Sequence, residues 1–201
     1  MLINREKFYD GIKKNGLFTS LTQSQVNGLN FILGEIETEV EDTRWAAYML
    51  ATAYHETAKT MLPVKEYGGN AYYTKMYDIK GTRPKLALQM GNKNPGDGAK
   101  YCGRGYVQLT WYNNYLNMGK LLGVDLVGNP ELAMDPKIAA RIMIEGMTKG
   151  QSTRGDFTGV SLENYFNSNT TDWVNARRII NGLDRAKDVA TYAQKFNSVL
   201  A

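Results

Sequence analysis

Hydrophobic positions recur mainly at helical spacing along the first third of the chain. The apolar side chains of residues 4–15 fall on one side of a short helix, and Gly16 is suited to end it. Thr22 and Gln25 have the spacing of a capping box, which predicts that a second helix begins there. Residues 43–57 are apolar on almost every face, as in a buried helix. This part of the chain is therefore predicted to be helical.

The rest of the chain continues the pattern after an interruption. Helical periodicity resumes in five segments, namely residues 108–122, 136–147, 162–166, 173–180 and 185–199. Pro130 and Pro136 stand where helices are expected to begin. Strict alternation is scarce, and only residues 67–77 suggest a small hairpin. The sequence predicts a mainly α fold with irregular loops.

The interruption, residues 63–105, is rich in glycine, asparagine, tyrosine, lysine and proline. Turn chemistry over so long a segment is uncommon in a compact domain unless it forms a functional lobe or a cleft wall. The length of 201 residues suits one domain. We expect a single domain over residues 1–201, with this loop-rich lobe inserted between helical segments.

The net charge of +4 favours acidic partners, such as an anionic surface or polymer. The basic residues are scattered in short pairs such as Lys13-Lys14 and Arg177-Arg178. A nucleic-acid-binding protein would show a dense basic block or stripe, so we expect no nucleic-acid partner.

The only cysteine, Cys102, cannot form an internal disulfide, so folding does not require an oxidising compartment. An inert buried thiol is a simpler interpretation than a nucleophile, because no second histidine is available to activate it.

The first seven residues have mixed charge, and we expect no conventional signal peptide. The longest apolar run, residues 45–54, is too short to span a bilayer, so we expect no stable membrane insertion.

Glu56 is the most informative residue, because it is a carboxylate at the end of the most apolar helix. Burial disfavours the charged form of a carboxyl group, which suits a general acid. The alternative is that Glu56 marks the solvent-exposed end of the helix. A second carboxylate would have to activate water or attack the substrate, and Glu66 is the nearest candidate. Asp78 and Asp97 are better explained as turn residues.

The residue before Glu56 is His55, the only histidine in the chain. A zinc-binding helix would need His-Glu-x-x-His, but Lys59 occupies the second histidine position. We therefore expect no metal and no cofactor. His55 is either a helper that hydrogen-bonds the site or a satisfied core histidine.

Residues 101–115 are dense in glycine, aromatic rings and amides. Glycine lets the backbone approach a ligand, flat rings stack on the faces of sugars, and amide side chains bond hydroxyl and acetamido groups. Together these features describe a carbohydrate site, although each ring taken singly suits core packing as well. Asn181 is likewise either a site amide or an ordinary helix-end residue.

Four groups of motifs, in order, resemble those of the family 19 glycoside hydrolases, which include plant-type chitinases and related phage endolysins. They are Ala53-Tyr54-His55-Glu56-Thr57, the run Tyr-x-Gly-Arg-Gly-x-x-Gln-Leu-Thr-Trp of residues 101–111, Asn129-Pro130-Glu131 with Asp135-Pro136, and Ile180-Asn181-Gly182. The resemblance implies a lysozyme-like α-helical fold with two lobes and a cleft, and an inverting hydrolysis that needs no metal. The disulfide cysteines of plant enzymes are missing and the loops are shorter, as in phage lysins.

Carried over by position, the resemblance assigns Glu56 as general acid, Glu66 as the base that activates water, and Thr110 as the residue that holds this water. Substrate-binding roles are expected for neighbouring side chains, namely His55, Tyr101, Arg104, Gln108, Trp111, Asn114 and Asn181. The basic residue that serves the site is left open among three candidates, namely Arg178, Arg185 and Lys187. Inversion predicts that roughly 6.5 to 9.5 Å separates the two carboxyl groups.

The resemblance predicts a peptidoglycan-degrading endolysin that cuts β-1,4 bonds between N-acetylmuramic acid and N-acetylglucosamine for host lysis. The alternatives are a chitinase, a lytic transglycosylase and a non-catalytic sugar-binding relative. Membrane disruption by residues 185–199 is disfavoured by their modest charge. We expect a monomer without a separate cell-wall-binding domain. It would bind bacterial peptidoglycan after a holin releases it from the host cytoplasm to the periplasm and cell wall.

Overall fold

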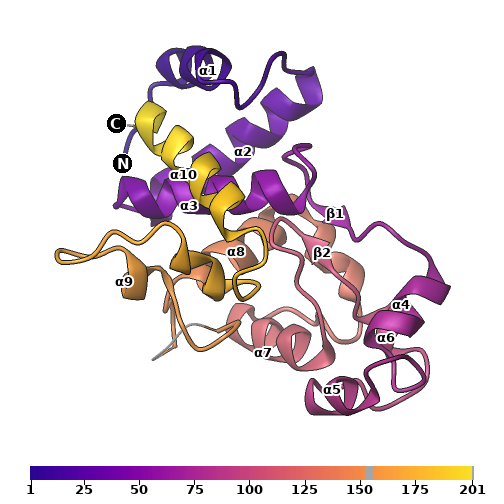
Figure 1. Cartoon of the computed structure of the whole chain (residues 1–201). Helices are drawn as coiled ribbons and strands as arrows, with labels where there is room; N and C mark the ends of the chain where they lie inside the picture. The colour runs from indigo at the N-terminus through magenta and orange to yellow at the C-terminus, as the bar shows by residue number, and fades with distance from the viewer. Residues whose placement is uncertain (153–155, 201) are drawn as a thin grey trace. The chain divides into compact units, whose positions relative to one another are not determined.

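The main chain of the protein is chiefly helical (Figure 1). A computed structural model describes residues 1–152 and 156–200. The chain divides into two compact units: unit 1 comprises residues 1–62 and 143–201, and unit 2 comprises residues 63–142. The prediction of a mainly α fold is confirmed. The expected loop-rich lobe falls within unit 2, which continues beyond it to residue 142.

Unit 1 is built from helices. They are α1 (Arg5–Lys14), α2 (Gln23–Glu39), α3 (Thr43–Glu56), α9 (Leu162–Tyr165), the 3-10 helix η2 (Asn175–Ile179) and α10 (Ala186–Leu200). One further helix, α8 (Pro136–Met147), begins in unit 2 and ends in unit 1. The capping box of α2 is confirmed, because the Thr22 hydroxyl accepts the Gln25 N–H and the Gln25 side chain accepts the Thr22 N–H.

The core of unit 1 surrounds α3. Every residue from Ala46 to Tyr54 is buried, which confirms the predicted buried helix. Helix α10 packs along α3 (Figure 1), where the Tyr54 ring makes edge contacts with Tyr192 and Phe196. Helix α1 packs against α10. This packing uses the apolar face of α10 and places Glu56 at the C-terminal end of a helix that the core holds in place.

The turn after Glu56 is fixed against α2. Ala58, Lys59 and Met61 all have left-handed φ angles, between 49° and 68°, which side chains other than glycine adopt only when their surroundings require it. The Gln25 side-chain amide donates to the Lys59 carbonyl oxygen at 3.0 Å. At Gly28 of α2, an added Cβ would lie 2.3 Å from the Met61 carbonyl oxygen. Glycine at this position therefore lets the turn lie directly on α2.

Unit 2 consists of short elements around a two-stranded antiparallel sheet. They are β1 (Val64–Lys65), α4 (Asn70–Tyr77), α5 (Pro84–Gln89), α6 (Asp97–Lys100), β2 (Arg104–Gly105), α7 (Tyr112–Leu122) and the 3-10 helix η1 (Pro130–Met134). In the sheet, Val64 lies opposite Gly105 and Lys65 lies opposite Arg104. Both expected helix starts are confirmed, since Pro130 begins η1 and Pro136 begins α8.

Two local predictions for unit 2 are wrong. The expected hairpin at residues 67–77 is replaced by α4, which packs against α6. The helix expected from residue 108 begins only at Tyr112. Gln108 and Trp111 have φ angles of 57° and 78°, and the Gln108 side chain donates to the Val64 carbonyl oxygen at 2.9 Å. This tertiary contact, together with the left-handed backbone, keeps residues 108–111 out of the helix.

Asp78 organises the segment that follows α4. Its buried carboxylate accepts backbone N–H groups from Lys80, Gly96 and Gly98 at 2.8 to 3.2 Å. Asp97 similarly accepts backbone N–H groups from residues 93 and 94. The interpretation of both aspartates as turn residues is confirmed.

Cys102 lies fully buried in unit 2. Burial raises the pKa of its thiol, which agrees with the interpretation of an inert residue.

In the ranges 1–152 and 156–200, no helix combines the length and the apolar character needed to cross a bilayer.

Candidate functional site

Glu56 ends α3 beside a buried arginine. The side chain of Glu56 is 15% exposed, and that of Arg177 is 1% exposed. Arg177 Nη1 lies 2.8 Å from Glu56 Oε1, in an orientation that makes the contact an ion pair rather than a directed hydrogen bond. Glu56 is therefore not a freely solvated helix end. Its carboxyl group is held by a guanidinium that the core of unit 1 fixes in place.

Arg177 also anchors the turn that carries Asn181. Its Nε donates to the Asp184 carbonyl oxygen at 2.9 Å, and its own carbonyl oxygen accepts the Asn181 N–H at 3.0 Å. Asn181 itself is exposed. Within unit 1, one arginine thus links the predicted general acid to the turn of a predicted sugar-binding amide.

His55 is half-buried on the same turn of α3 as Glu56. Burial lowers the pKa of the His55 imidazole, although the negative charge of Glu56 opposes this shift. A neutral imidazole at pH 7 fits both interpretations of His55, as a helper and as a satisfied core residue.

The carboxylate of Glu66, in unit 2, accepts three hydrogen bonds. The phenol of Tyr77 donates to Oε1 at 2.6 Å, and the phenol of Tyr72 donates to the same oxygen at 3.2 Å. The backbone N–H of Gly103 donates to Oε2 at 3.2 Å. Burial and the hydrogen bond to Glu66 raise the pKa of Tyr77, so this phenol remains a donor at neutral pH. Glu66 is thus a half-buried carboxylate with a fixed orientation, as a base that positions water would require.

Gly103 brings two further predicted residues close to Glu66. An added Cβ at Gly103 would lie 2.7 Å from Gln108 Oε1 and 3.3 Å from Thr110 Oγ1. The Thr110 hydroxyl donates to the Gln108 carbonyl oxygen at 2.8 Å. The structure therefore brings Glu66, Gln108 and Thr110 together around one glycine, and any side chain at this glycine would fill the space between them.

Trp111 and Asn114 flank this group. The Trp111 ring makes an edge contact with the Tyr77 ring, with 5.0 Å between centroids. The Asn114 side-chain amide donates to the Thr110 carbonyl oxygen at 2.9 Å. Both side chains are partly exposed, so each can still present a face or an amide to a ligand.

Tyr101 and Arg104 do not fit their predicted roles in substrate binding. Tyr101 is 3% exposed and packs against the rings of Tyr112 and Tyr115, so it offers no face for a sugar to stack on. Arg104, also 3% exposed, pairs with Glu131 at 2.7 Å and donates to two backbone carbonyl oxygens. Both residues hold unit 2 together, and sequence motifs alone do not distinguish this role from ligand binding.

The basic residue beside Glu56 was not among the three candidates. Arg178 is exposed and bonds the Asn175 side chain, and Arg185 pairs with Asp188 at the surface. Lys187 is exposed. The pair Arg177-Arg178 is visible in the sequence, but the choice between its two members depends on which side chain of η2 faces the core.

No group of histidine, cysteine, aspartate and glutamate side chains suited to hold a metal ion occurs in the part of the chain that the structure describes.

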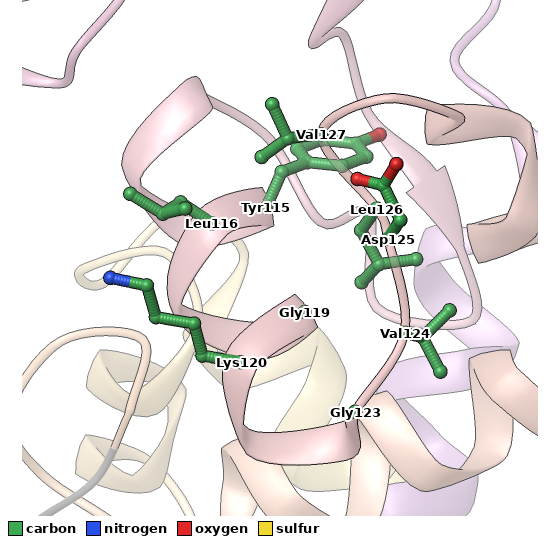
Figure 2. Close-up of a pocket in the computed structure, with 9 residues that line it drawn as sticks. All are labelled: Tyr115, Leu116, Gly119, Lys120, Gly123, Val124, Asp125, Leu126 and Val127. Atoms are coloured by element: carbon green, nitrogen blue, oxygen red, sulfur yellow. The ribbon is translucent and has the colours of Figure 1, made fainter.

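A pocket of about 280 Å³ lies in unit 2 between α7 and residues 124–127 (Figure 2). Its lining residues are Tyr115, Leu116, Gly119, Lys120, Gly123, Val124, Asp125, Leu126 and Val127. None of the predicted site residues lines this pocket, so it is separate from the group around Glu66.

Comparison with known proteins agrees with the motifs. Residues 25–181 match the glycoside hydrolase family 19 domain, described as chitinase class I. Endochitinase 1 of Theobroma cacao is 54% identical over 43 residues, which are 21% of this chain and 13% of that protein. The chain thus matches only a small part of the length of this curated relative.

Solved structures share the fold. Chitinase C from Streptomyces griseus HUT6037 has a TM-score of 0.60 at 22% identity, over 98% of this chain and 76% of that chain. A bacterial family 19 chitinase has a TM-score of 0.62 at 21% identity, over 100% of this chain and 96% of that chain. Since the family match covers most of the sequence, the chain belongs to glycoside hydrolase family 19.

Proposed function

We propose that the protein is an endolysin that hydrolyses the β-1,4 bond between N-acetylmuramic acid and N-acetylglucosamine in bacterial peptidoglycan. The observation that carries the hydrolytic part is the contrast between its two carboxyl groups. Glu56 ends a buried helix beside a buried guanidinium, whereas Glu66 is half-buried and oriented by three donors. Two carboxyl groups held in fixed positions are what acid and base roles require. In this scheme Glu56 carries a proton before the bond breaks, and its ion pair with Arg177 is the state that follows proton donation.

In the proposed reaction, Glu56 gives its proton to the glycosidic oxygen as the bond to the anomeric carbon breaks. Glu66, with Thr110 holding the water, takes a proton from the water that attacks the opposite face of the sugar. The product has inverted configuration, and the two carboxyl groups should lie roughly 6.5 to 9.5 Å apart in the working enzyme. Arg177, 2.8 Å from Glu56, would stabilise the carboxylate that remains after proton donation.

The basic balance of the chain, +4, supports an anionic polymer as substrate, and chitin is neutral. We further propose that the protein acts as a monomer and reaches the wall from the host cytoplasm through a holin. Neither a nucleic acid nor a metal ion has a role in this scheme.

A chitinase is the second candidate, because the relatives named above are chitinases. Turnover of chitin oligomers, measured beside turnover of purified peptidoglycan, separates the two functions. A parent protein that cleaves chitin oligomers and leaves peptidoglycan intact would establish the second candidate.

The test of the mechanism is mass spectrometry of products from peptidoglycan digested in ¹⁸O-labelled water. The parent should release reducing muropeptides that carry the label. Glu56→Gln and Glu66→Gln should each lower kcat by at least about 100-fold, since each removes one proton-transfer group. Glu39→Gln, at an exposed position at the end of α2, is the control and should retain full activity.

Other outcomes of this experiment exclude the proposal. Anhydro products would identify a lytic transglycosylase. Full activity in Glu56→Gln would refute the role of the acid. Binding to peptidoglycan without any product would identify a non-catalytic relative.

A further inference from the structure

The two units differ in charge. Unit 2 contains eleven lysines and arginines and six aspartates and glutamates, a net charge of +5. Unit 1 contains thirteen and fourteen, a net charge of −1. The excess of positive charge therefore lies entirely in the unit that contains Glu66.

Within unit 2, this charge is concentrated in residues 75–100, here called the basic segment. The segment contains six basic residues and two carboxylates, so its net charge of +4 equals that of the whole chain. The two carboxylates are Asp78 and Asp97, and both accept hydrogen bonds from backbone N–H groups. The hydrogen bonds of both carboxylates therefore go to the backbone of the segment, and only Asp78 is also affected by a lysine charge, that of Lys80.

The lysines of the basic segment, in contrast, face solvent. Lys75, Lys80, Lys85 and Lys93 are all exposed. Among the described residues, no ion pair involves any of these four side chains. Their charges are thus available to a partner outside the molecule.

The basic segment is joined to the group around Glu66 through α4. Lys75 lies on this helix between Tyr72 and Tyr77, the two phenols that donate to Glu66. Beyond the helix, the Arg83 guanidinium donates to the Met76 carbonyl oxygen at 2.9 Å. Hydrogen bonds from Thr82 to the Lys75 carbonyl oxygen fold the chain back onto the same turn. The exposed charges therefore begin on the helix that orients Glu66.

We propose that the basic segment binds the free carboxylates of the peptides that branch from the glycan strands of peptidoglycan, and so favours this polymer over neutral chitin. This inference rests on the proposed function. Exposed lysines are mobile point charges, and each contact with a carboxylate in water is weak. Several such contacts along a repeating polymer act together, so their combined effect on binding is large.

Binding to insoluble sacculi tests the inference independently of catalysis. Glu56→Gln serves as the background, so that the sacculi stay intact during cosedimentation. In this background, Lys75, Lys80, Lys85 and Lys93 are replaced together by Gln. The matched control replaces four exposed lysines of unit 1, namely Lys7, Lys13, Lys14 and Lys149. Both variants lose the same charge, and circular dichroism confirms that each is folded.

Four preparations serve as ligand: unstripped sacculi, sacculi stripped of phosphate-containing polymers, the stripped sacculi with carboxylates converted to neutral amides by carbodiimide and ethanolamine, and chitin. The variant in the basic segment should bind stripped sacculi about tenfold more weakly than the background protein. The affinity of the unit 1 control should differ from that of the background protein by less than about twofold, because the four lysines replaced in the control lie outside the basic segment. On amidated sacculi and on chitin, all three proteins should bind alike.

Equal weakening in both lysine variants would overturn the inference, because total charge would then explain the binding. Weakening that persists on amidated sacculi would also overturn it. So would a dependence on these lysines that appears only with unstripped sacculi, because the partner would then be phosphate. If the parent cleaves no peptidoglycan while lysine-dependent binding remains, the proposed function fails and the inference stands.

Discussion

Tyr77 is the closest partner of the Glu66 carboxylate, at 2.6 Å, and Tyr72 donates to the same oxygen at 3.2 Å. Tyr77→Phe removes the shorter bond and keeps the ring that contacts Trp111. We predict that this change lowers kcat about tenfold, since a hydrogen bond to a charged group contributes about 1.5 kcal/mol or more. The acidic limb of the kcat/KM profile should move to higher pH, because a carboxylate that has lost a donor is protonated more readily.

Tyr72→Phe is the matched control for this prediction. Its bond to Glu66 is longer and the residue is 39% exposed, so kcat should fall by less than about threefold. A fall in kcat with an unchanged pH profile in Tyr77→Phe would assign the phenol to packing rather than to positioning the carboxylate.

His55 gives a prediction for the dependence of stability on pH. Burial lowers the pKa of His55 below its ordinary value of 6.5, so the unfolded chain binds this proton more tightly than the folded one. The contribution of the neutral imidazole to the free energy of unfolding is present above pH 6.5. It is lost as the pH falls from 6.5 toward the folded-state pKa.

Urea unfolding at pH 7.5 and 5.5 measures this effect. The parent should lose more stability between the two values than His55→Gln, because glutamine has no proton to bind. The same loss in both proteins would show that other groups carry the pH dependence.

At the scale of single residues, the sequence predicted roles for Glu56, Glu66, Gln108 and Thr110 from their motifs, and the last three lie together around Gly103. It did not identify Arg177, which lies next to the equally basic Arg178 in a 3-10 helix. Local sequence does not show which of two adjacent side chains points into a core. The same lack of information on burial explains why substrate-binding roles were wrongly expected for Tyr101 and Arg104, two residues of the motif at 101–111.

Helix α2 offers a matched pair of glycines. An added Cβ at Gly28 would lie 2.3 Å from the Met61 carbonyl oxygen. An added Cβ at Gly34 would have no neighbouring atom within 4 Å. Gly28→Ala should lower the free energy of unfolding by about 2 kcal/mol, because the turn after α3 must move. Gly34→Ala should raise it by about 0.5 to 1 kcal/mol, the usual gain in helix propensity.

Urea unfolding of both alanine variants checks this pair. Since the turn that moves directly follows Glu56, Gly28→Ala should also lower kcat, and Gly34→Ala should leave kcat unchanged. Stabilisation by both substitutions would show that α2 and the turn are not in close contact.

At the scale of elements, long amphipathic helices were predictable and short ones were not. The capping box and the apolar periodicity located α2 and α3, because those signals are local. Helix α4 escaped prediction because glycines precede it and five of its eight residues are tyrosine, asparagine or threonine with no apolar period. Its stability comes from packing against α6 and from the hydrogen bonds of Asp78, neither of which is visible locally.

For the whole molecule, composition gave a mild positive charge without showing where it lies. The charges of unit 1 nearly cancel, so the average hides a net charge of +5 in unit 2. Residues 63–105, where the composition changes, lie within unit 2. Its extension to residue 142 depends on contacts between elements, which no local pattern records.

The two units also differ in whether their residues are continuous in the sequence. Unit 2 is one continuous stretch, whereas unit 1 combines two separate stretches, residues 1–62 and 143–201. During synthesis on the ribosome, every residue of unit 2 has been made while α3 still lacks α10, the helix that covers it. The arginine that holds Glu56 is made late as well, at position 177. A nascent chain therefore acquires the surroundings of Glu66 first, and those of Glu56 only after Arg177 and α10 have been made.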